Sequence, residues 1–176
     1  IVTDSLADYF FITSDFAKDN LKKNGVPDEK VFFVGNVMID SLMANMQRLR
    51  CPEIFDSLAL EEGKYIVLTL HRPNNVDDID TLLAMLGTID ENVNGTPVVF
   101  PIHPRTEQRL KGVDYHFANI RFVKPLGYLE FIYTIKHSMA VITDSGGITE
   151  ETTIMHIPCM TLRDNTERME TCTVGT

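Results

Sequence analysis

The sequence predicts an α/β fold built on a Rossmann-like, doubly wound parallel sheet. In the last two thirds of the chain, strand-like apolar runs alternate with helical patterns five times over. The first and fourth of these runs, residues 65–70 and 139–143, are almost continuously apolar. Such runs are typical of parallel strands that are buried on both faces. Histidine, arginine, serine and glycine residues directly follow several of these runs. Parallel sheets of this kind bind ligands at the edge formed by the carboxyl ends of their strands.

The first 50 residues predict a smaller, separate segment. Residues 9–13 and 31–34 are strand-like, and Ser14 caps a predicted helix that runs to Lys23 and ends at Gly25. A second helix is predicted over residues 38–49, and residues 51–63 show no clear period. We expect residues 1–50 to be the terminal segment of a preceding domain with a hinge, and residues 51–176 to be an incomplete Rossmann-like domain.

The βα repeats of the second part follow in order. The five predicted strands are residues 65–70, 97–102, 120–123, 139–143 and 158–162. The predicted helices between them are residues 77–89, 105–111, 128–137 and 147–155. This order favours a single sheet whose strand ends carry the functional residues.

Composition and charge narrow the function. Of the 176 residues, 44% are hydrophobic and 23% are charged, which is ordinary for a soluble globular protein. The formal net charge of −9 repels phosphate backbones, so no nucleic-acid partner is expected. Three scattered cysteines, the lack of a leader and the lack of a long apolar run predict a cytoplasmic protein with no membrane partner. No metal or cofactor is expected, because no spacing typical of metal ligands occurs.

The turn Thr143-Asp144-Ser145-Gly146-Gly147 follows the fourth strand and opens a helix. Adjacent glycines and the free amides of a helix N-terminus suit a phosphate, and Ser145 adds a hydroxyl donor. A plain tight turn with Ser145 as the N-cap explains the same residues. The turn matches neither the dinucleotide fingerprint nor the P-loop, so NAD and nucleoside-triphosphatase functions lose support.

Other polar residues fall on the same edge. Glu150 and Glu151 lie early in that helix. A carboxylate there can accept hydrogen bonds from ribose hydroxyls, or it can simply be stabilised by the positive end of the helix dipole. His71-Arg72 ends the first strand of the domain, and His103 and Arg105 follow the second. Such pairs are either solvated surface groups or a proton donor beside a phosphate clamp.

Two further features follow or flank the predicted strands. The segment 163–168 places two arginines after the last strand. One of them could anchor a pyrophosphate, or they could form only a surface ion pair. Phe131, on the predicted helix 128–137, is more often a core residue than a stacking platform. Together, the residues predict a cleft for a nucleoside diphosphate.

The string Thr-Asp-Ser-Gly-Gly-Ile-Thr-Glu-Glu at 143–151, with segments 163–168 and 174–176, resembles the carboxyl-terminal half of the non-hydrolysing UDP-N-acetylglucosamine (UDP-GlcNAc) 2-epimerases. The His71-Arg72 strand end and segments 35–40 and 125–131 fit the same family in order and spacing. The resemblance implies one half of a glycosyltransferase-B-type two-domain architecture. It also implies interconversion of UDP-GlcNAc and UDP-N-acetylmannosamine (UDP-ManNAc) by elimination and re-addition of UDP, in a homodimer.

The resemblance also implies residue roles. Ser145, Gly146 and Gly147 would hold the diphosphate, Glu151 the ribose, and Phe131 would line the uridine pocket. Arg72 would bind substrate, Arg168 would reach the phosphate or the sugar, and His71 would be the catalytic histidine of this half. These implied roles involve His71, Arg72, Phe131, Ser145, Gly146, Gly147, Glu151 and Arg168.

Departures from the family pattern leave alternatives open. Pro73-Asn74 stands where the family more often has Arg-Glu, and the carboxylates for proton transfer at C2 belong to the family's amino-terminal domain. We therefore expect this chain alone to bind UDP without turnover. The alternatives are a hydrolysing 2-epimerase, a glycosyltransferase of the same architecture, and a non-catalytic nucleotide-sugar-binding module.

Overall fold

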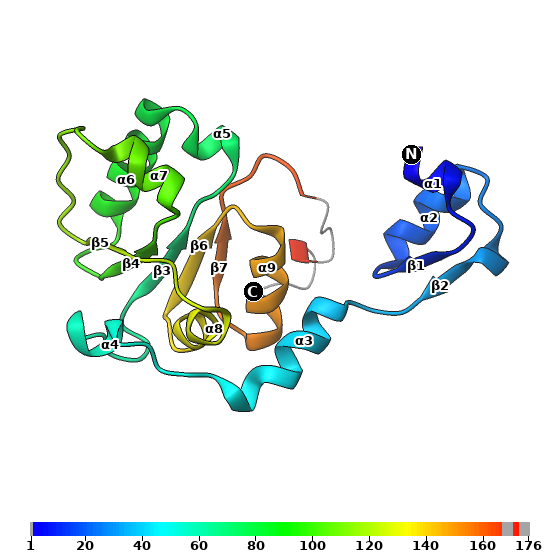
Figure 1. The fold of residues 1–176 in the computed structure, drawn as a ribbon, viewed down its shortest axis with the longest axis horizontal. Helices are drawn as coiled ribbons and strands as arrows, with labels where there is room; N and C mark the ends of the chain where they lie inside the picture. The colour runs from blue at the N-terminus through cyan, green and yellow to red at the C-terminus, as the bar shows by residue number, and fades with distance from the viewer. Residues whose placement is uncertain (1, 167–170, 173–176) are drawn as a thin grey trace. The chain divides into compact units, whose positions relative to one another are not determined.

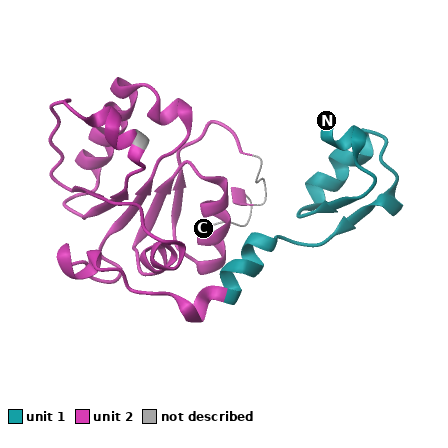
Figure 2. Cartoon of the chain, viewed as in Figure 1, with its two compact units in different colours: residues 1–44 teal, residues 45–176 magenta. Residues whose placement is uncertain are grey.

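The computed structural model describes residues 2–166 and 171–172, except for the side chain of Arg105. The chain divides into two compact units, residues 1–44 and residues 45–176 (Figure 2). The assignment of the first 50 residues to a preceding domain stays a prediction.

The first unit is a small α/β segment. Its elements are α1 (Val2–Leu6), β1 (Phe10–Ile12), α2 (Asp15–Lys23), a 3-10 turn (Asp28–Lys30), β2 (Val31–Phe33) and most of α3 (Val37–Asn45). The predicted cap is present, because the Ser14 side chain accepts a hydrogen bond from the Ala17 amide at 3.4 Å. The helix predicted over 38–49 is shorter than expected: α3 ends at Asn45, and a 3-10 turn (Met46–Arg48) follows.

The second unit holds the predicted βα repeats. Its strands are β3 (Ile66–Thr69), β4 (Val98–Pro101), β5 (Ile120–Val123), β6 (Ala140–Thr143) and β7 (Cys159–Thr161). Its helices are α4 (Ile54–Ser57), α5 (Pro73–Val76), α6 (Ile79–Asn92), α7 (Pro104–Leu110), α8 (Tyr128–Lys136) and α9 (Gly146–Met155). The five predicted strands and four predicted helices are confirmed to within three residues at each end. Two short helices were missed, α4 in the stretch expected to be irregular and α5 after His71-Arg72. None of the helices in the described residues combines the length and apolar composition that a bilayer crossing requires.

All five strands run parallel in the order β5-β4-β3-β6-β7 (Figure 1). The chain therefore builds outward from β3 through β4 to β5, crosses back, and builds outward on the other side through β6 to β7. This is the doubly wound topology that the sequence predicts. The order reverses between β3 and β6, and a parallel sheet opens a crevice for ligands at such a reversal.

Side chains of β3 show how the two faces of the sheet are covered. Ile66 and Leu68 belong to one buried cluster with Leu82 and Leu86 of α6. Tyr65, just before the strand, points to the opposite face, since its hydroxyl donates to the Thr134 carbonyl of α8 at 2.7 Å. Helices thus cover both faces (Figure 1), and the polar strand ends are left as the open edge.

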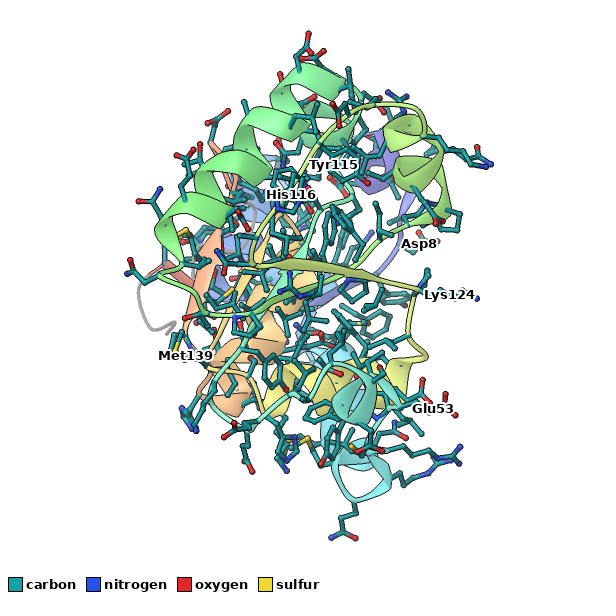
Figure 3. All side chains as sticks on the ribbon, turned by 90° about the vertical axis from the view of Figure 1, so that its left-hand side faces the viewer. Asp8, Glu53, Tyr115, His116, Lys124 and Met139 are labelled. Atoms are coloured by element: carbon teal, nitrogen blue, oxygen red, sulfur yellow. The ribbon has the colours of Figure 1, made fainter. Side chains whose placement is uncertain are left out.

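Aromatic packing fixes the outer flank of the sheet beside β5. Figure 3 shows Tyr115 and His116 on the loop that leads into β5. The Tyr115 ring lies 5.4 Å from the Phe117 ring and 5.7 Å from the Phe122 ring, measured between centroids. These contacts anchor the loop by ring packing, so its role is structural.

Candidate functional site

The Asp144 carboxylate is the centre of the polar structure at the open edge. It follows β6 directly and is fully buried. It accepts hydrogen bonds from the backbone N–H of His71 at 3.0 Å and of Arg72 at 2.9 Å, and from the side-chain amide of Asn75 at 3.0 Å. His71 Nδ1 lies 2.7 Å from its other oxygen. A buried charge is stable only when it is satisfied in this way.

This arrangement sets the chemical state of the His71 ring. A carboxylate can only accept, so the Nδ1 facing it carries the proton. The other ring nitrogen, Nε2, is then turned away from Asp144, and the side chain is 58% exposed. His71 is therefore held as an oriented imidazole at the reversal of the strand order.

His71 faces a cavity of about 220 Å³ at the carboxyl ends of four strands. Its lining includes Phe131 from α8 and Ser145 from the start of α9, both of which the sequence analysis singled out. The full lining is Thr69, His71, Pro101, His103, Pro125, Leu126, Phe131, Ser145 and Ile148. The expectation that the unusual residues gather at one edge is confirmed, including for His103.

The glycine pair at the start of α9 follows directly after the cavity-lining Ser145. Ser145 is the N-cap residue, with an extended backbone, and its side chain makes no capping hydrogen bond. Its amide instead donates to Thr143 Oγ1 at 3.0 Å. Ser145 thus occupies the N-cap position, as the alternative of a plain turn expects, but its hydroxyl does not cap the helix. The first amides of α9, at Gly146 and Gly147, have no carbonyl four residues earlier within the helix, so they remain suited to an anion.

Glu151 lies at the sixth position of α9, one turn beyond the cavity-lining Ile148. The residue is only 6% exposed. Tyr128, the first residue of α8, donates its hydroxyl to Glu151 Oε1 at 3.3 Å. Burial raises the pKa of the Glu151 carboxyl and the negative charge of Glu150 adds to this, whereas the Tyr128 hydrogen bond lowers it.

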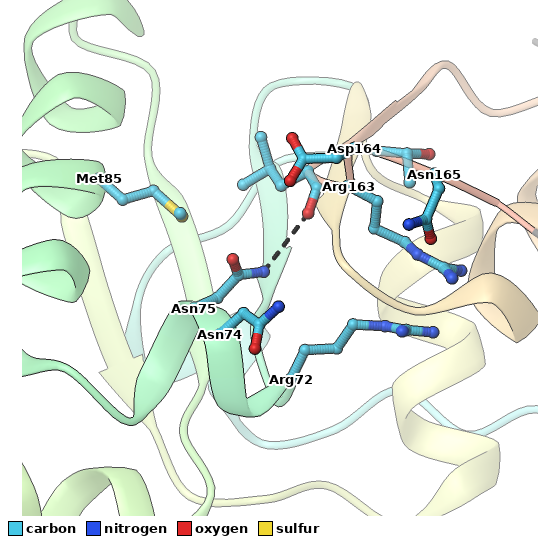
Figure 4. Close-up of a pocket in the computed structure, with 9 residues that line it drawn as sticks. Arg72, Asn74, Asn75, Met85, Arg163, Asp164 and Asn165 are labelled. Atoms are coloured by element: carbon cyan, nitrogen blue, oxygen red, sulfur yellow. Dashed lines mark hydrogen bonds between the residues drawn. The ribbon is translucent and has the colours of Figure 1, made fainter.

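Arg72 points away from the 220 Å³ cavity. Its Nε donates to the Asp144 carbonyl at 2.9 Å, and its side chain lines a second pocket of about 430 Å³. Figure 4 shows the Arg72 and Arg163 side chains extending in the same direction in this pocket, with Asn75 and Asn165 beside them. The two guanidinium groups share this pocket with the Asp164 carboxylate, so its lining carries charges of both signs.

The structure brings most of the predicted site residues to one edge, but in two groups. His71, Phe131 and Ser145 share the smaller cavity, with Gly146, Gly147 and Glu151 following along α9. Arg72 lies on the other side of Asp144. Arg168 falls outside the described residues.

Sequence reasoning missed Asp144, Asn75 and Tyr128. Asp144 was visible as an acidic residue directly after a buried strand and before a glycine pair. Its partners follow β3, however, and nothing in the local sequence shows that β3 and β6 are neighbours. Tyr128 follows Gly127 at the start of a predicted helix, which carries no functional signal by itself.

We predict that Asp144→Asn destabilises the protein by about 2–4 kcal/mol, because an amide nitrogen would face backbone donors that need an acceptor. Urea unfolding measures the difference. Asp114→Asn is the matched control, because this exposed loop carboxylate should change stability by less than about 0.5 kcal/mol. Equal effects of the two substitutions would contradict the central role of Asp144.

A second prediction concerns Glu151 and pH. Its folded-state pKa lies above the unfolded value of about 4.3, so the folded state binds the proton more tightly than the unfolded state. The free energy of unfolding therefore falls as the pH rises from the unfolded-state pKa to the folded-state pKa. Glu151→Gln removes the buried charge, so the variant should be more stable than the wild type at pH 7, with the gap closing below about pH 4. Thermal unfolding across pH tests this, with the exposed Glu91→Gln on α6 as control. A variant that is less stable at neutral pH would show that the carboxylate is not strained by burial.

Comparison with known proteins extends this picture. The family model described as UDP-N-acetylglucosamine 2-epimerase matches residues 1–176. The Methanocaldococcus jannaschii UDP-N-acetylglucosamine 2-epimerase is 38% identical over 99% of this chain and 50% of its own length. A Pseudomonas aeruginosa UDP-2,3-diacetamido-2,3-dideoxy-D-glucuronate 2-epimerase is also 38% identical, over 99% of this chain and 49% of its own.

Solved structures agree. The M. jannaschii epimerase in complex with UDP-GlcNAc and UDP superposes with a TM-score of 0.80 at 35% identity, over 97% of this chain and 49% of that one. The Rickettsia bellii UDP-N-acetylglucosamine 2-epimerase gives a TM-score of 0.83 at 27% identity, over 98% and 46%. The chain spans about half the length of the relatives it matches, which agrees with the expected half of a two-domain architecture. On the match of the whole chain to the family model, this chain belongs to the UDP-N-acetylglucosamine 2-epimerase family.

Proposed function

We propose that this chain is the UDP-binding portion of an epimerase that interconverts UDP-GlcNAc and UDP-ManNAc by elimination and re-addition of UDP. The observation that carries the proposal is the convergence of His71, Phe131 and Ser145 on one cavity at the strand-order reversal. Relatives that carry this enzyme's name support it, and one of them is solved with UDP-GlcNAc and UDP. These names favour an epimerase over a hydrolase or a glycosyltransferase.

The proposed binding mode follows the order of residues along α9. The diphosphate lies at the helix N-terminus, where the Gly146 and Gly147 amides and the Ser145 hydroxyl donate hydrogen bonds to it. The ribose lies one to two turns further on, where the Glu151 carboxylate accepts hydrogen bonds from its hydroxyls. Phe131 lies against the uridine. Arg72 lines the neighbouring pocket, so its role in binding substrate, like that of Arg168, is assigned by family resemblance alone.

The proposed chemistry uses these donors on the leaving group. In the elimination step a proton leaves C2, the C1–O bond breaks, and UDP departs with the bonding electrons, leaving a C1=C2 double bond. Negative charge then develops on the UDP oxygen, where the amides at the helix N-terminus stabilise it. We assign the oriented His71 to this end of the reaction. Re-addition reverses the step after a proton has returned to the opposite face of C2.

Turnover is assigned to a longer protein. The chain spans about half the length of its relatives, and the groups that move the C2 proton are assigned to the other half. The proposal therefore gives this chain UDP binding and gives the longer protein, as a cytoplasmic homodimer, the epimerase reaction.

Calorimetric titration with UDP and ADP tests the proposal directly. We expect saturable binding of UDP that is tighter than binding of ADP, because Phe131 and its surroundings meet the base. Glu151→Ala should weaken UDP binding roughly 10-fold or more, as expected for the loss of hydrogen bonds to a charged acceptor. Glu91→Ala, on the exposed side of α6, should leave it unchanged.

Two results would contradict this proposal. One is the absence of UDP binding at millimolar concentration, and the other is equal affinity for UDP and ADP. In the longer protein, epimerisation should exchange the C2 hydrogen with solvent, which a glycosyltransferase does not require. A nucleotide-sugar-binding module without catalysis would bind UDP and exchange nothing.

A further inference from the structure

We infer that Tyr128 is a positioning residue of the nucleotide site, which holds the Glu151 carboxylate in the orientation that grips the ribose hydroxyls. This inference rests on the proposed function. It assigns to the start of α8 the discrimination between a ribonucleotide and a nucleotide that lacks ribose hydroxyls.

The hydrogen bond between the two side chains is the starting point. Glu151 is 6% exposed, whereas Tyr128 is 42% exposed and donates its hydroxyl to Oε1 at 3.3 Å. Burial and the adjacent Glu151 charge raise the pKa of the Tyr128 phenol, so it stays a donor at neutral pH. A carboxylate offers about four lone-pair positions, of which the phenol takes one. Enough acceptor capacity remains for two vicinal hydroxyls.

The backbone around Tyr128 is itself fixed. The Gly127 amide donates to the Glu130 side chain at 3.3 Å, and the Phe131 amide donates to the Gly127 carbonyl at 2.8 Å. These bonds close the first turn of α8. Residues three apart share a helix face, so the same turn presents Phe131 to the cavity and Tyr128 to Glu151.

The phenol also acts on the charge of Glu151. The titratable groups that shift its pKa are Tyr128 from α8 and Glu150 from its own helix. Burial and Glu150 favour the protonated carboxyl, whereas Tyr128 favours the carboxylate. Only the ionised carboxylate can accept hydrogen bonds from both ribose hydroxyls. Tyr128 therefore supports both the orientation and the negative charge of Glu151 that ribose binding requires.

The test compares UDP with an analogue that lacks both ribose hydroxyls, by calorimetry on the whole chain between about pH 5 and pH 8. Both ligands carry the same diphosphate, so the ratio of their affinities cancels phosphate titration. The variants are Tyr128→Phe, Glu151→Gln and the double substitution. Tyr133→Phe is the matched control: it removes a phenol hydroxyl from the same helix, on a residue whose ring packs against Phe55 and His137.

We expect Tyr128→Phe to lower the preference for UDP over the analogue about threefold to tenfold at neutral pH. The preference should be lost at a higher pH than in the wild type as the solution is acidified. The double variant should lose no more than Glu151→Gln alone, because the phenol acts through Glu151. Tyr133→Phe should match the wild type.

The inference is overturned if Tyr128→Phe keeps the full preference, or if it weakens UDP and the analogue equally, as a purely structural residue would. Full additivity in the double variant overturns it as well. Each of these results leaves the proposed function standing as long as the wild type binds UDP. A wild-type chain that ignores UDP removes the proposed function and this inference together.

Discussion

The arrangement of the open edge depends on one buried charge, the Asp144 carboxylate. Its position directly after β6 places it beside the end of β3, because Thr69 and Thr143 are partners in the register of the two strands. The hydroxyls of these threonines lie 2.6 Å apart and join the two strand ends. At this position Asp144 accepts hydrogen bonds from the backbone amides of His71 and Arg72 and from the side chain of Asn75. It also contacts the ring of His71. An uncompensated charge at this place would cost several kcal/mol, so the surrounding chain adopts the path that satisfies it.

Two buried carboxylates on the same β6–α9 segment have opposite characters. Asp144 is satisfied by donors from the protein itself, and it organises structure. Burial raises the pKa of Glu151, which accepts a hydrogen bond from the Tyr128 hydroxyl, so the folded chain holds this charge at a cost in stability at neutral pH. A buried charge that lowers the stability of the fold is typical of a residue that binds a ligand. The contrast supports the separation of a structural centre at Asp144 from a binding role at Glu151.

The sequence predicts those features whose signal lies within a few neighbouring residues. The apolar runs of β3 and β6, the Ser14 cap and the glycine turn before α9 each carry their information within a few residues. The short helix α5 was missed because Pro73-Asn74-Asn75 is typical of a turn, although Pro also suits the first position of a helix. The pairing of His71 with Asp144 was beyond reach, since it depends on β3 and β6 being neighbours although two strands separate them in the chain. The same holds for Tyr128 and Glu151, which are joined by the packing of α8 on α9.

The central claim is that UDP binds along the start of α9 at the reversal of the strand order. Titration of the isotopically labelled chain with UDP, followed by amide NMR, tests it residue by residue. The account predicts that the largest shifts occur at Ser145, Gly146, Gly147 and Glu151, with Phe131 also affected. The amides of Asn94 and Gly95, at the opposite edge of the sheet, should not move. Shifts confined to that opposite edge, or spread evenly over the chain, would contradict the account.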